Sequence, residues 1–122
     1  MSREPTVETL DWRSVCPISS ALDLLGDKWS LLIVRDLLSN DTRTYSEFLE
    51  SPEHISTNIL AARLRLLTAV GIIERTDPTG APRNNAYRLT QRGQDLRPVL
   101  EGLGRWAQTH LKDLHSEIVD IV

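Results

Sequence analysis

The sequence is poor in cysteine, in aromatic residues and in long apolar runs. Its 122 residues contain one cysteine and 5% aromatic residues. No apolar stretch approaches the roughly 18 residues that a membrane-spanning helix needs. The first residues, 1–5, are polar and lack the apolar core of a signal peptide. A single thiol forms no disulfide within its own chain, so we expect a cytoplasmic protein without internal cross-links and without a membrane partner.

Signs of a metal site or of catalysis are also missing. The three histidines, His54, His110 and His115, do not have the spacing of metal ligands. A thiol peroxidase acting through Cys16 would need a resolving cysteine or a neighbouring catalytic histidine, and neither is evident. We therefore expect no metal, no cofactor and no enzymatic activity.

The net charge of −3 hides an uneven distribution. Residues 56–97 contain seven arginines and three acidic residues, a local charge of +4, which leaves −7 for the rest of the chain. A basic middle between acidic flanks fits a local phosphate-binding face. Scattered, solvated arginines are the alternative.

The N-terminal part predicts a loose arm over residues 1–14, followed by a helix. Cys16 falls at an N-cap position, and Pro17 falls at the first helical position, where its missing N–H costs nothing. The helix should cover residues 17–25 and end at Gly26.

Two further helices are expected before the middle of the chain. Asp27 would cap a helix over residues 28–38, whose apolar residues nearly surround it, so this helix should lie at the centre of the domain. After a short extended piece, residues 45–49 should form one short helix, and residues 51–53 a turn.

The second half predicts a long helix, a hairpin and a last helix. Ser56 or Thr57 would cap a helix that ends near residue 70. Within residues 72–89, two segments of strand character flank a turn rich in proline and glycine, which is typical of a hairpin. An apolar repeat from residue 91 to near residue 120 suggests a helix of about 45 Å, which would outrun its own domain and need a partner.

The helix after Thr57 is the candidate DNA reader. Leu60, Leu64 and Leu67 repeat at helical spacing and should face the core, so Asn58 and Arg65 should face outward. Asparagine pairs with adenine, and arginine pairs with guanine or phosphate. The alternatives are an ordinary amphipathic helix and an ordinary polar hairpin turn. The predicted DNA-contacting residues are Ser56, Thr57, Asn58, Ala61, Ala62, Arg65, Arg75, Arg83 and Asn84.

The order of these motifs resembles the HxlR-type winged helix-turn-helix regulators, which are related to the MarR family. The resemblance covers about residues 15–107. It rests on Cys16-Pro17, the run LGDKW at 25–29, YSEFL at 45–49, residues 55–64, GIIER at 71–75, and YRLT at 87–90 with Gly93. Ala61 and Ala62 stand where polar residues are common, and Asn85 stands where the returning strand is usually apolar.

The resemblance implies a mainly α fold with a small β-hairpin wing, forming a single domain over residues 1–122. It implies a homodimer that binds double-stranded operator DNA, with residues 56–70 as recognition helix and residues 72–89 as wing. The dimer would be built from residues 17–25 and from the last helix within residues 91–122. The operator sequence does not transfer from relatives.

Cys16 is a separate candidate for a regulatory role. The positive end of a helix dipole favours the thiolate, which is the form that reacts with oxidants and electrophiles. The resemblance also implies such a role for a cysteine at this position. An inert packing cysteine is the alternative, and so is a winged-helix module that binds a protein or a small ligand without redox chemistry.

Overall fold

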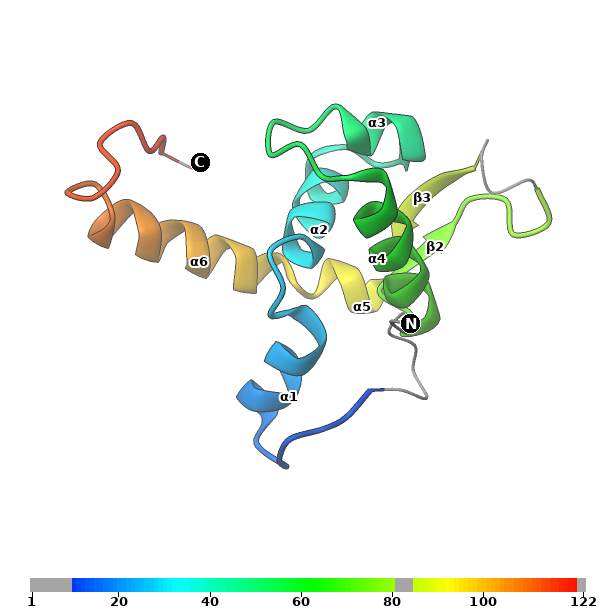
Figure 1. The fold of residues 1–122 in the computed structure, drawn as a ribbon, viewed down its shortest axis with the longest axis horizontal. Coiled ribbons are helices and arrows are strands. Elements are labelled where there is room, and N and C mark those ends of the chain that lie inside the picture. The colour runs from blue at the N-terminus through cyan, green and yellow to red at the C-terminus, as the bar shows by residue number, and fades with distance from the viewer. Residues whose placement is uncertain (1–9, 81–84, 121–122) are drawn as a thin grey trace.

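The computed structural model describes residues 10–80 and 85–120, which form six helices and three short strands (Figure 1). The elements are α1 (Pro17–Leu25), α2 (Ser30–Ser39), β1 (Arg43–Thr44), α3 (Tyr45–Leu49), α4 (Thr57–Ala69), β2 (Ile73–Arg75), β3 (Ala86–Leu89), α5 (Gln91–Gln94) and α6 (Arg97–His110). None of the described helices is both long enough and apolar enough to cross a bilayer. This is the predicted winged helix-turn-helix order of elements.

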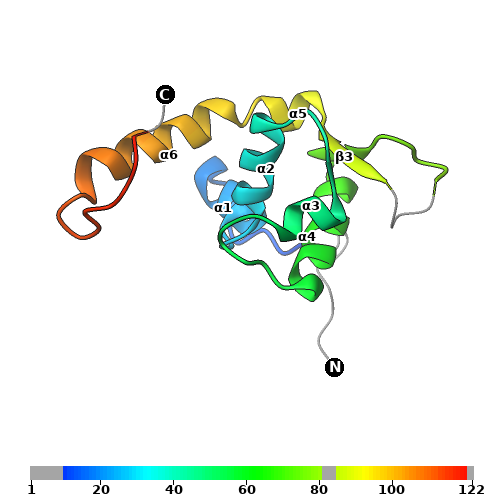
Figure 2. The same cartoon turned by 90° about the horizontal axis from the view of Figure 1, so that it is seen from above.

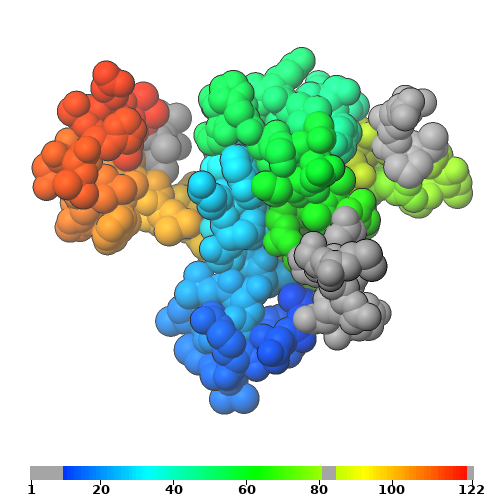
Figure 3. Space-filling view, in the orientation of Figure 1, coloured from blue at the N-terminus to red at the C-terminus, as the bar shows by residue number. Residues whose placement is uncertain are grey.

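The helices α2, α3 and α4 and the strands form a central body. The helix α6 projects from it in both views (Figures 1 and 2), and α1 projects from it in Figure 1. The β2–β3 hairpin and α6 extend from opposite sides of this body (Figure 1). In the space-filling view, α1 and the end of α6 form two separate lobes (Figure 3). Much of the surface of these two helices is therefore not covered by their own chain.

Side-chain caps start the helices where the sequence places polar residues. Thr44 and Glu47 form a complete capping box at α3, and the Ser56 hydroxyl accepts a hydrogen bond from the Ile59 amide at α4. In α2, however, the N-cap is Trp29 and not the predicted Asp27, so this helix begins two residues later than predicted. The Asp27 carboxylate still accepts a hydrogen bond from the amide of Ser30 (2.9 Å).

The sheet has the antiparallel order β1-β3-β2. Arg43 lies opposite Tyr87, and Ile73 lies opposite Leu89. The turn from α4 into the hairpin needs Gly71, whose φ of 79° is in the left-handed region. The short extended piece predicted before α3 forms β1, which pairs with β3 and is the third strand of the sheet.

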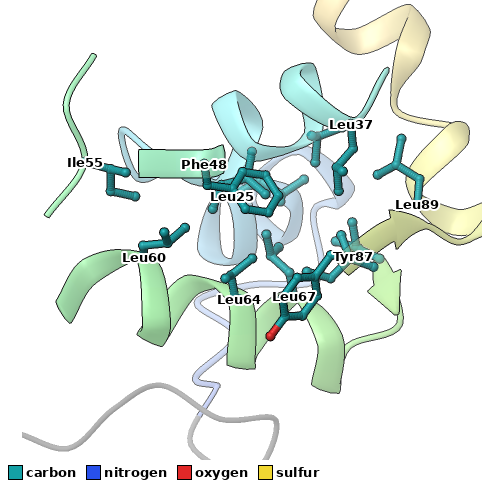
Figure 4. Close-up of a cluster of buried hydrophobic side chains, with 13 residues drawn as sticks. Leu25, Leu37, Phe48, Ile55, Leu60, Leu64, Leu67, Tyr87 and Leu89 are labelled. Carbon is teal, nitrogen blue, oxygen red and sulfur yellow. The ribbon is translucent and has the colours of Figure 1, made fainter. Parts of the chain in front are cut away.

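The core lies between α2, α4 and the sheet (Figure 4). Leu60, Leu64 and Leu67 are buried, as the helical spacing predicted, and Phe48 packs 6.4 Å from the Tyr87 ring, measured between centroids. The core cluster consists of Leu25, Ile33, Val34, Leu37, Phe48, Ile55, Leu60, Leu64, Leu67, Ile72, Ile73, Tyr87 and Leu89. Because α4 contributes three leucines to it, the outer face of α4 is fixed in orientation.

The prediction of one long last helix is wrong. The helical segment is divided into α5 and α6, and α6 ends at His110 after 14 residues, which is about 21 Å. Pro98 lacks an amide hydrogen and therefore lies in the first turn of α6. Beyond the helix the chain folds back, and Gln108 donates a hydrogen bond to Asp120 (2.8 Å).

Candidate nucleic-acid interface

The helices α3 and α4 form the helix-turn-helix, and their N-terminal ends are tied together. The Tyr45 hydroxyl donates a hydrogen bond to the carbonyl oxygen of Thr57 (2.9 Å). The turn between them is fastened to α2, because the Arg35 guanidinium binds both carboxylate oxygens of Glu53 (2.7 and 2.8 Å). The pKa of Glu53 is lowered, mainly by these hydrogen bonds from Arg35. The start of α4 is thus held by α3 through Tyr45, and the turn before it is held by α2 through Arg35.

The predicted contact residues of α4 share one outward face. Asn58 and Arg65 are exposed, and Ala61 and Ala62 lie half-buried between them. Ser56 and Thr57 are exposed at the helix start, and the Ser56 hydroxyl, besides capping the helix, keeps a proton that it can donate. A face that presents an amide, a guanidinium and small side chains can approach the edges of base pairs closely.

The polar residues of the hairpin that the structure describes form hydrogen bonds within the hairpin itself. The Arg75 guanidinium donates to the carbonyl oxygens of Pro78 (2.6 Å) and Gly80 (3.5 Å), so it holds the hairpin turn. Asn85 is 3% exposed, and its amide oxygen accepts the Asp77 amide (2.8 Å). This bond explains a polar residue where an apolar one is usual.

Two of the predicted wing contacts, Arg83 and Asn84, lie outside the described residues. Their proposed contacts with DNA therefore stay predictions. Among the described parts of the hairpin, Arg88 is exposed on β3 and forms an ion pair with Glu74 (2.8 Å).

A groove of about 650 Å³ separates α4 from the hairpin. Arg65 and Arg75 line it together with apolar and aromatic side chains, among them Tyr45 and Tyr87. Sequence reasoning missed both tyrosines as parts of this surface, although Tyr45 stands at the start of the short helix. The groove is lined by one arginine of α4 and one of the hairpin, and arginine is a residue type that contacts the sugar–phosphate backbone of DNA.

The comparisons with known proteins agree with this geometry. The family model described as HxlR-like helix-turn-helix matches residues 24–115. The chain belongs to this family. It is therefore a transcriptional regulator of the DNA-binding helix-turn-helix class and not an enzyme.

Three relatives illustrate the extent of the similarity. An uncharacterised HTH-type transcriptional regulator of Synechocystis sp. is 41% identical over 86 residues, which are 70% of this chain but only 63% of that protein. The reduced form of the transcriptional regulator YodB from Bacillus subtilis has 32% identity and a TM-score of 0.66, covering 82% of this chain and 98% of YodB. The redox regulator HypR in its reduced form has 27% identity and a TM-score of 0.71, covering 83% and 99% of the two chains.

The arginines of this HxlR-like chain are less available than the charge count predicted. Arg63 forms an ion pair with Asp27 (3.5 Å) and is only 15% exposed. Arg92 donates to the carbonyl oxygen of Val70, at the C-terminal end of α4, where a cation is favourable. The basic surface that faces outward is therefore smaller than seven arginines suggested.

Cys16 occupies the predicted N-cap of α1 and is exposed. Its side chain forms no capping hydrogen bond. Arg13, the one basic residue close to it in sequence, binds Asp23 instead, and the pKa of Asp23 is lowered chiefly by the hydrogen bond from the Arg13 amide. No group of three potential metal-ligating residues occurs in the described part of the chain.

Proposed function

We propose that this HxlR-like regulator binds operator DNA as a homodimer, with α4 in the major groove and the hairpin along the sugar–phosphate backbone. The outward placement of Asn58 and Arg65 on a helix whose opposite face is buried carries this proposal. The groove between α4 and the hairpin supports it, because it places Arg75 of the hairpin beside Arg65 of the reader face.

The proposed dimer rests on the two projecting helices. Ile18 and Leu22 on α1 are 73% and 55% exposed, and Leu103 and Trp106 on α6 are 53% and 56% exposed. Large apolar residues clustered on helices of one chain mark a surface that a partner covers. A second copy presents the same two stripes, so a two-fold arrangement would bury both and place two α4 helices about one DNA turn apart.

Selection of bound duplexes from a random pool tests the proposal. We expect a pseudo-palindromic site with two half-sites, and affinity that falls steeply with salt concentration because phosphate contacts release counterions. Binding to all duplexes with equal affinity, or to none, would refute sequence-specific recognition. Binding to no duplex would favour instead a module that binds a protein or a small ligand.

We further propose that Cys16 gives this regulator a response to oxidants or electrophiles. The thiol is exposed at the start of α1, beside the apolar stripe that the dimer would use. HypR, whose structure in the oxidised form has a TM-score of 0.67 to this chain, is described as a redox regulator. In the simplest reaction, the Cys16 thiols of two copies lose two protons and two electrons to an oxidant and form one disulfide.

A further inference from the structure

The junction between α1 and α2 contacts the reader helix through one carboxylate. Gly26 ends α1 with its amide bonded to the Leu22 carbonyl (2.8 Å), and a β-carbon at Gly26 would lie 2.4 Å from that oxygen. The next residue, Asp27, accepts hydrogen bonds from the amides of Trp29 (3.0 Å) and Ser30 (2.9 Å). The junction is therefore a tight connection in which Asp27 has little freedom to move.

The same carboxylate binds a residue of α4. One oxygen of Asp27 accepts the Ser30 hydroxyl (2.6 Å) and lies 3.5 Å from the Arg63 guanidinium. Burial alone would raise the pKa of Asp27, but the hydrogen bonds from Ser30 and Trp29 and the charge of Arg63 outweigh it and lower that pKa. The carboxylate is thus charged at neutral pH, and it faces a cation of the reader helix.

Arg63 belongs to the inner side of α4 rather than to its DNA-facing side. Its side chain is 15% exposed, whereas Asn58 and Arg65 on the same helix are exposed residues. Arg63 thus serves the attachment of the helix, although sequence alone would count it among the phosphate-binding arginines.

We propose that Asp27 and Arg63 are positioning residues for operator recognition. Their ion pair fixes the angle between the projecting helix α1 and the reader helix α4, and thereby sets the half-site spacing that the regulator accepts. The inference rests on the proposed function, in which α1 is part of the dimer and α4 contacts bases.

Neutralising Asp27 and neutralising Arg63 change the net charge of the protein in opposite directions. An effect on DNA binding that both variants share therefore reflects the placement of α4 and not the net charge. Asp27→Asn keeps oxygen and shape but removes a negative charge, and Arg63→Gln removes a positive charge. Binding of each variant and of the double variant is measured by fluorescence anisotropy, at one salt concentration, to a duplex selected by the wild type and to a random duplex of equal length. Further duplexes carry half-site spacers one base pair longer or shorter.

Both single variants are expected to lose about tenfold in the ratio of selected to random affinity, and the double variant should lose no more than either one. Random-duplex affinity should rise for Asp27→Asn and fall for Arg63→Gln, following net charge. Both variants should also discriminate less between spacer lengths. Arg63→Lys, which keeps the charge, should recover most of the ratio.

Lys112→Gln is the matched control, because it removes one positive charge, as Arg63→Gln does. Lys112 belongs to an exposed ion pair with Asp120 (3.2 Å). It should leave the affinity ratio unchanged. All assays are run below the melting temperature of each variant, determined by circular dichroism. Ratios within twofold of the wild type, additive losses, or unchanged spacer preference would overturn the positioning role, while a wild type that selects no duplex would refute the proposed function first.

Discussion

Tyr45 and Thr57 are the first residues of α3 and α4, and a hydrogen bond of 2.9 Å joins the hydroxyl of one to the carbonyl oxygen of the other. The bond spans the turn of the helix-turn-helix. It holds the start of α4 close to α3, and the start of a recognition helix is the part that usually meets base edges. The Tyr45 hydroxyl is thus one of the contacts that set the position of α4 relative to α3.

Tyr45→Phe removes this bond and leaves the ring in place. We expect the free energy of unfolding to fall by about 1 kcal/mol, the usual net value of one hydrogen bond. Operator affinity should fall about threefold, since the start of α4 is less firmly held. Urea unfolding and operator titration measure the two effects, and an unchanged operator affinity would show that the bond does not govern recognition.

Asn58→Ala and Arg65→Ala test the two roles assigned to the reader face. The loss of Asn58 should reduce discrimination between operator variants by about 1–3 kcal/mol at the base it contacts. The loss of Arg65, if it binds phosphate, should weaken binding to all sequences and lower the salt slope by about 1.

Both variants are compared with Lys112→Ala, which removes a charge on the far segment after α6. Titrations at several salt concentrations, with operators that differ at single base pairs, separate the effects. If operator affinity is the same for Arg65→Ala as for the wild type, the outward face of α4 is not the reader face.

The sequence predicted the elements that depend on local patterns. The leucines at positions 60, 64 and 67 recur at helical spacing, and Ser56 is a cap that starts α4. Each of these features can be recognised from a few neighbouring residues in the sequence. The order of helices and hairpin, and the outward face of α4, follow from them.

Contacts between distant segments were not predictable in this way. The Asp27–Arg63 pair joins residues 36 positions apart, and nothing in either neighbourhood indicates the partner. The charge count therefore treated Arg63 as available for phosphate. The apolar repeat after residue 110 suggested a helix, but a tertiary hydrogen bond from Gln108 to Asp120 accompanies a folded-back end.

Leu22→Glu and Leu103→Glu test the proposed dimer surface. A charge in an apolar interface is costly to bury, so each variant should sediment as a monomer at concentrations where the wild type is a dimer. Val119→Glu is the control, since Val119 is 76% exposed but lies on the segment after α6. Analytical ultracentrifugation gives the association state, and a dimeric Leu22→Glu and Leu103→Glu would place the interface elsewhere.

The Arg35–Glu53 pair predicts a loss of stability in acid. Because Arg35 lowers the pKa of Glu53 in the folded state, this carboxylate stabilises the fold above its unfolded pKa, and the contribution disappears as the pH falls through the folded value. The Glu53 side chain is 36% exposed, so the effect should be less than about 1 kcal/mol.

Unfolding free energy measured between about pH 7 and pH 3 should therefore decline less for Glu53→Gln than for the wild type. Glu53→Gln should also be slightly less stable at pH 7. Parallel curves for the two proteins would show that Glu53 contributes nothing that depends on its charge. Glu50→Gln is a suitable control, because Glu50 is an exposed acid of the same turn.

Cys16→Ser decides whether the exposed thiol is a sensor. An oxidant such as diamide should change operator affinity of the wild type and produce a cross-linked dimer on a non-reducing gel, because two Cys16 thiols can lose two protons and two electrons to it. Cys16→Ser should bind operator with wild-type affinity and show neither effect, since serine keeps the size of the N-cap residue. A thiol reductant should reverse both effects in the wild type. If the serine variant responds to the oxidant as the wild type does, the response belongs to another group, and Cys16 is an inert residue at the start of α1.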